Sequence, residues 1–192
     1  MENHHGYLEL ILGPMFSGKT SKLLEVYKQY TFCNIPICVI NHSEDTRYHG
    51  ENQMVTHDQK SIPCINCTVL KDAFEIDEQL KKDTFSAVLI NEGQFFSDLY
   101  DFVCVLLTHK KHVYVCGLDG DFQRKKFGSM LDLIPLCDSV YKLNSLCVNC
   151  KNGTKAIFSH RIDNKTTEQK QIGASDKYVP LCRKCYMTDN RD

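Results

Sequence analysis

The chain has no excess of either charge. Lysine and arginine number 23 against 24 aspartate and glutamate, and the formal net charge is −1 over 192 residues. Proteins that bind nucleic acid over a broad surface usually carry a clear basic excess. The balance argues against that class and favours a small anionic ligand held by a few placed groups.

Long hydrophobic runs are also lacking. No stretch approaches the roughly 20 apolar residues that span a bilayer, and the first apolar run, 8–12, is too short for a signal peptide. We therefore expect a cytoplasmic protein without membrane contact, where thiols stay reduced. Eleven cysteines are many for that setting.

Short apolar segments alternate with segments of helical spacing along the first part of the chain. The expected strands are 7–12, 35–40, 87–90 and 113–117, and the expected helices are 19–32 and 98–108. Continuously apolar strands alternating with helices are typical of an α/β fold with a mostly parallel sheet and helices on both faces. Ligands of such folds bind beyond the carboxyl ends of the strands.

The composition changes after Leu143. Residues 151–177 are polar, and cysteine pairs flank them. We expect a nucleotide-binding α/β domain over 1–143 and a small metal-binding domain over 144–192, in which a long loop is tied at its base.

A phosphate-binding motif follows the first expected strand. The pattern G-x-x-x-x-G-K-[ST] covers Gly13, Pro14, Met15, Phe16, Ser17, Gly18, Lys19 and Thr20. The strand before it and the helix after it are the context that the motif requires. Lys19 would reach the β- and γ-phosphates, and the Thr20 hydroxyl would help to hold Mg²⁺. The other interpretation is a chance glycine turn. Alone, the motif does not separate a kinase from an ATPase or a GTPase.

A carboxylate follows the third expected strand. Glu92 would lie beside the phosphate loop, where it could accept the proton of an attacking hydroxyl. From its position alone, a solvated strand-end acid is somewhat favoured. Asn91 stands where many P-loop proteins place a metal-associated aspartate, and Asp119 is a second candidate that also suits a turn.

Three C-x-x-C pairs occur in the chain. Cys147/Cys150 and Cys182/Cys185 would together supply four thiolates for a tetrahedral, structural Zn²⁺. Zinc there would close the base of the segment 151–181 and lower the entropy cost of ordering it. Cys64/Cys67 could replace either pair on spacing alone.

Six motifs in this order and spacing resemble the thymidine kinase family of the cellular and poxviral type (type II deoxynucleoside kinases). They are the phosphate loop at 13–20, the segments 45–48 and 56–58, Glu92-Gly93-Gln94-Phe95-Phe96, 118–124 continued by 127–128, and 172–178. Together they cover about residues 7–187. The resemblance implies a P-loop, RecA-like α/β fold with a small zinc-ribbon-like domain, and zinc on the two late cysteine pairs.

The resemblance also implies roles for individual residues. Glu92 would be the general base on the thymidine 5′-hydroxyl, and Arg47 would lie near the transferred phosphate. The implied nucleoside contacts are Met15, Phe95, Leu118, Phe122, Phe127, Gln169, Lys170, Gln171, Ile172, Gly173 and Tyr178. Plain core packing is the alternative for the phenylalanines, and we expect it for Phe96. The family implies Mg²⁺-ATP as donor, thymidine and deoxyuridine as acceptors, a homotetramer, and feedback inhibition by thymidine triphosphate.

The chain departs from the family pattern at one important position. The family usually has aspartate before the catalytic glutamate, and here it is Asn91. We expect Mg²⁺ to depend on Thr20, the ATP phosphates and water. Ala174-Ser175 also differs slightly from the usual Gly-Ala.

Two other functions compete with the kinase. A P-loop ATPase could use a zinc ribbon to bind nucleic acid, although the near-neutral charge opposes it. The other alternative is a catalytically inactive nucleotide sensor, which is suggested by Asn91 in place of the usual aspartate.

Overall fold

The computed structural model describes residues 5–44, 53–55, 60–73, 84–162, 168–170, 173 and 176–189. Arg47 with its motif 45–48, the motif 56–58, Gln171, Ile172 and 174–175 lie outside the described residues.

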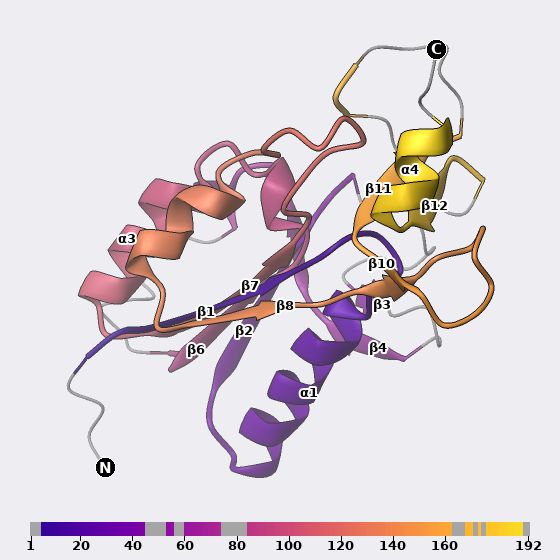
Figure 1. The fold of residues 1–192 in the computed structure, drawn as a ribbon. Helices are drawn as coiled ribbons and strands as arrows, with labels where there is room; N and C mark the ends of the chain where they lie inside the picture. The colour runs from indigo at the N-terminus through magenta and orange to yellow at the C-terminus, as the bar shows by residue number, and fades with distance from the viewer. Residues whose placement is uncertain are drawn as a thin grey trace.

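A six-stranded sheet forms the centre of the molecule (Figure 1). Its strands, in spatial order, are β5 (Ile65–Cys67), β2 (Ile37–His42), β6 (Ala87–Ile90), β7 (His112–Gly117), β1 (Tyr7–Leu12) and β8 (Ser139–Lys142). Each neighbouring pair runs parallel, so all six carboxyl ends meet at one edge. The expected parallel sheet is therefore confirmed. One strand, β7, separates the phosphate-loop strand β1 from β6, which leads to Glu92.

Helices cover both faces of the sheet, as Figure 1 shows. Helix α1 (Lys19–Phe32) packs Leu23 and Leu24 with Ile11 on one face. Helix α3 (Leu99–Thr108) packs its apolar stripe with Leu8 and Leu10 on the other. Successive strand residues point to opposite faces, which is why strands buried on both faces are apolar throughout.

Two details of the sheet differ from the sequence expectation. Strand β2 covers 37–42 and not 35–40, because the Ile35 N–H closes the turn after α1 on Tyr30 O, and Pro36 O accepts from Ser86 N–H. The short strands β5 and β8 were not anticipated. Val140 and Tyr141 on β8 are more than 40% exposed, so this edge strand lacks the continuous burial that marks the others.

Smaller elements complete the main body. An antiparallel hairpin joins β3 (Gln53–Val55) to β4 (Ser61–Pro63). The part of the chain that the structure describes also has three 3₁₀ helices, η1 (Leu70–Asp72), η2 (Gly93–Phe95) and η3 (Met130–Leu136). No helix in the described ranges is long and apolar enough to cross a membrane.

In its described residues, the C-terminal segment contains two antiparallel strand pairs and one helix. The pairs are β9 (Ser145–Leu146) with β10 (Lys155–Ala156) and β11 (Phe158–Arg161) with β12 (Tyr178–Leu181), followed by α4 (Arg183–Asp189). It has a small core of its own around Ala156, Leu181 and Tyr186. Figure 1 places it beside the start of α1. A domain division at 143/144 stays a prediction.

Candidate active site

The phosphate loop follows β1 and turns into α1. Gly13 has φ 152°, and a Cβ there would lie 2.6 Å from Leu143 O, so only glycine fits. Gly18 is left-handed at φ 84°, and Phe16 is also left-handed at φ 62°. These angles let the backbone curl around one concavity at the positive end of the helix. The sequence motif therefore has the loop geometry that binds phosphate.

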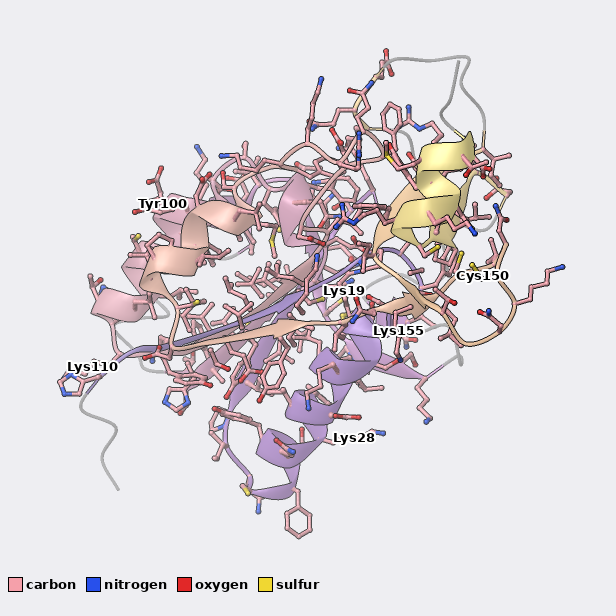
Figure 2. All side chains as sticks on the ribbon, in the orientation of Figure 1. Lys19, Lys28, Tyr100, Lys110, Cys150 and Lys155 are labelled. Carbon is pink, nitrogen blue, oxygen red and sulfur yellow. The ribbon has the colours of Figure 1, made fainter. Side chains whose placement is uncertain are left out.

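Two side chains in this loop suit an anion. Lys19 is buried at the start of α1 (Figure 2), and its Nζ donates to Pro14 O at 2.9 Å. Ser17 Oγ is buried without a hydrogen-bond partner among the described residues. A buried unpaired hydroxyl costs about 1–3 kcal/mol, and a phosphate oxygen would remove that cost. The Met15 N–H is already committed to Ser159 Oγ at 2.9 Å.

Glu92 follows β6 in a left-handed conformation, with φ 55° and ψ 42°. Its side chain is 7% exposed, so it is not a solvated strand-end acid. Gln94 Nε2 donates to Glu92 Oε2 at 2.6 Å, and Gln94 Oε1 accepts from Leu118 N–H at 2.9 Å. The carboxylate is therefore fixed by a buried amide that is itself anchored after β7.

Asn91 belongs to a row of side chains across four strands. Asn91 Nδ2 donates to Asn41 Oδ1 at 2.8 Å, and Asn41 Nδ2 donates to Asn66 Oδ1 at 3.2 Å. Cys116 Sγ donates to Asn91 Oδ1 at 2.9 Å. Because Asn91 is only 1% exposed, its amide is engaged inside the sheet as a neutral group.

One cavity gathers most of the predicted site. Its lining includes Met15, Phe16, Ser17, Gly18, Lys19, Thr20, Glu92, Phe95, Leu118, Phe122, Phe127, Gln169, Gly173 and Tyr178. Gly13, Pro14 and Lys170 are outside this lining. Phe96 is 1% exposed in the core beneath α3, as expected.

Residues 168–170 are held against the cavity by side-chain contacts. Gln169 Nε2 donates to Asp121 Oδ2 at 2.7 Å and to Lys126 O at 3.1 Å. Lys170 pairs with Glu44, and its Nζ lies 4.9 Å from the centre of the Phe95 ring. Lys170 thus contacts Phe95, which lines the cavity, without lining the cavity itself.

Two further titratable groups lie at this edge of the sheet. His42 packs against Phe96 and Phe95, with ring centres 4.7 and 5.4 Å away, and burial followed by the charge of Lys170 lowers its pKa. Lys142 pairs with Asp119, and burial followed by the charge of Lys19 lowers the Lys142 pKa. Asp119 is therefore an ion-pair partner next to the phosphate loop.

Four cysteines converge at the base of the C-terminal segment. The Sγ atoms of Cys147, Cys150, Cys182 and Cys185 all lie within 4.8 Å of one another. Cys150 Sγ is 3.7 Å from Cys182 Sγ and 3.5 Å from Cys185 Sγ, and tetrahedral Zn–S bonds of about 2.3 Å require sulfur separations of roughly 3.8 Å. Figure 2 labels Cys150 beside α4. The group can hold a metal ion. Cys64 and Cys67 join no such group in the described part of the chain.

The thymidine kinase family model matches residues 6–186. The chain belongs to the thymidine kinase family. A thymidine kinase of sheeppox virus is 39% identical over 185 residues, covering 96% of this chain and 99% of the relative. Thymidine kinase 1 of Dictyostelium discoideum is 37% identical, covering 97% and 80%, and thymidine kinase a of Arabidopsis thaliana is 40% identical, covering 96% and 76%.

Several residues at this thymidine kinase site were not anticipated from the sequence. Glu44 and Ser159 line the cavity, and Gln94 holds Glu92. Arg161 stacks on the ring of Phe122, which lines the cavity, without lining it itself. Ser159 and Arg161 alternate with Phe158 and His160 along β11, but the buried positions are the polar ones, so the residue types gave no signal for this inward face.

Proposed function

We propose that this chain transfers the γ-phosphate of ATP to the 5′-hydroxyl of thymidine, giving thymidine monophosphate, and that it also accepts deoxyuridine. The observation that carries the proposal is the single cavity lined by a phosphate loop, a buried carboxylate and an aromatic wall. A nucleoside kinase needs all three together, whereas an ATPase has no need of the aromatic wall.

The donor phosphates bind the loop 13–20 in this proposal. The Lys19 amine, the Ser17 hydroxyl and the start of α1 face the same concavity and would bind the phosphates, with Arg47 near the transferred group. Thr20 would hold the Mg²⁺ that accompanies ATP and neutralises phosphate charge. Since the Asn91 amide is engaged within the sheet, it would bring no charge to that metal.

Glu92 is the general base of the reaction. Its carboxylate takes the proton of the 5′-hydroxyl as that oxygen bonds to the γ-phosphorus, and the bond from phosphorus to the ADP oxygen breaks. Gln94 keeps the Glu92 side chain in place during this step. The left-handed Glu92 backbone is a local strain of the kind found at functional sites.

The aromatic wall selects the base. Phe95, Phe122, Phe127 and Tyr178 offer ring surface to a planar pyrimidine, with Met15 and Leu118 beside them. Backbone groups of 169–173 would match the polar edge of thymine. We infer that a base pocket closed by these rings excludes the larger purines.

The four cysteines would hold a structural Zn²⁺. Their mutual distances fit tetrahedral coordination, and four protein ligands leave no position for water. The zinc would close the base of the segment that contributes Gln169, Gly173 and Tyr178 to the cavity. From its family membership we further propose that the chain forms a homotetramer and is inhibited by thymidine triphosphate.

The test measures ADP release from ATP in the presence of thymidine and, separately, of single-stranded DNA. We expect stimulation by thymidine and none by DNA. Stimulation by DNA alone would favour the ATPase. A wild type as inactive as Glu92→Gln would favour the inactive sensor.

A further inference from the structure

Strand β11 faces the cavity with one side and α4 with the other. Ser159 and Arg161 are buried, while Phe158 and His160 are half-buried. The rings of Phe158 and His160 contact Tyr186 on α4, at centre distances of 4.9 and 5.7 Å. Because strand residues alternate between faces, Arg161 is directed toward the cavity wall.

Arg161 is 1% exposed and contacts the back of that wall. Its guanidinium lies 3.7 Å from the centre of the Phe122 ring. Its Nη2 donates to Tyr178 Oη at 2.9 Å, and Tyr178 is its direct cross-strand neighbour on β12.

The same guanidinium also reaches the chain beyond β11. Nη1 donates to Glu168 O at 2.8 Å, and Nη2 donates to Gln169 O at 3.2 Å. Thus one buried cation contacts Phe122, Gln169 and Tyr178, three residues that line the cavity. It does not line the cavity itself, so it acts through these neighbours.

Phe122 is fixed from a second direction by the C-terminal helix. Tyr186 Oη donates to Phe122 O at 2.6 Å, and Tyr186 packs with Cys182 in the small core. The Phe122 backbone is therefore tied to the four-cysteine cluster, while Arg161 restrains the Phe122 ring and joins it to residues 168–169.

We propose that Arg161 is a positioning residue for the nucleoside, which orders Phe122, Tyr178 and the backbone of 168–169 as one preformed wall. This role rests on the proposed thymidine phosphorylation. Lysine cannot replace it, because only the planar guanidinium can stack on the ring and donate to three acceptors at once. Loss of the order weakens nucleoside binding and leaves the phosphate loop intact.

Steady-state kinetics of Arg161→Lys test the proposal, with Arg183→Lys as the matched control. Arg183 is exposed and also stacks on a ring, 5.3 Å from the centre of Phe158. We expect Arg161→Lys to raise the KM for thymidine roughly 10- to 100-fold, as the loss of one or two charged hydrogen bonds implies. The KM for ATP stays within about threefold and the zinc content is unchanged, since neither depends on this wall. Arg183→Lys behaves as the wild type.

A double-mutant cycle with Tyr178→Phe separates positioning from direct contact. Tyr178→Phe removes the hydroxyl that Arg161 bonds and keeps the ring. We expect Arg161→Lys/Tyr178→Phe to be no worse than Arg161→Lys alone, because both changes break the same contact. Multiplicative effects would overturn the proposal.

Three other results would also overturn it. They are a wild-type KM for thymidine in Arg161→Lys, an equal rise of both KM values, and loss of zinc from Arg161→Lys, which would make Arg161 a support of the C-terminal fold. If the wild type does not phosphorylate thymidine, the proposed function is refuted instead. Failure of the proposed function can therefore be distinguished from failure of the proposed role of Arg161.

Discussion

Replacing Asn91 with aspartate removes one hydrogen bond of the buried side-chain row. Asn91 Nδ2 now donates to Asn41 Oδ1 at 2.8 Å, and a carboxylate would place an acceptor against that acceptor. Leaving a buried acceptor unpaired costs about 1–3 kcal/mol, and more for a charged group. We therefore expect Asn91→Asp to lower the free energy of unfolding by at least about 2 kcal/mol. With a slope of about 2 kcal/mol per molar, the urea midpoint falls by about 1 M.

Asn66→Asp is the matched control at the end of the same row. Asn66 Oδ1 only accepts, from Asn41 Nδ2 and Cys64 Sγ, so a carboxylate preserves both contacts. We expect its stability to stay within about 0.5 kcal/mol of the wild type. The reasoning is refuted if Asn91→Asp unfolds at the wild-type urea midpoint or if Asn66→Asp is the less stable variant.

The same variant tests the magnesium hypothesis. If Mg²⁺ relies on Thr20, the phosphates and water, the added carboxylate should strengthen Mg²⁺ binding. A gain of about 1.4 kcal/mol in binding free energy would lower the Mg²⁺ concentration for half-maximal activity roughly tenfold. An unchanged half-saturation in Asn91→Asp would argue against the hypothesis.

Three further changes test other parts of the account. Phe96→Ala should lower the free energy of unfolding by about 3–5 kcal/mol, whereas Phe32→Ala, at a side chain 88% exposed, should leave it within about 0.5 kcal/mol. Cys182→Ala/Cys185→Ala should lose both zinc and thymidine phosphorylation, and zinc retained in a metal analysis would contradict the four-cysteine site. Burial lowers the pKa of His42, so the His42 imidazole binds a proton more readily in the unfolded state than in the folded state. The free energy of unfolding should therefore fall as the pH drops below about 6.5. His42→Gln should make that fall smaller in urea titrations at different pH values.

Much of the sheet could be predicted because burial on both faces leaves a clear sequence pattern. Strands 7–12 and 87–90 and helix 19–32 occur with the expected bounds. The polar end of β2 could not be predicted, since Asn41 and His42 look like loop residues but are buried by the amide row and two phenylalanine rings.

Some residues of the candidate site could likewise be predicted from the sequence, and others could not. The phosphate loop and Glu92 follow apolar strands, so their common edge of the sheet could be inferred. Arg161 and Ser159 could not, because their importance depends on a strand that packs between the cavity and α4, a contact across more than a hundred residues of sequence (Met15 N–H to Ser159 Oγ). A lone arginine in a polar stretch gives no sign of being buried.

The most direct test of the kinase follows the γ-phosphate itself. ATP labelled on the γ-phosphate is incubated with a panel of nucleosides and either the wild type or Glu92→Gln. We predict label on the 5′-oxygen of thymidine and deoxyuridine, none on purine nucleosides, and a rate at least about 100-fold lower for Glu92→Gln. Label released only as inorganic phosphate, or transfer undiminished in Glu92→Gln, would contradict the account.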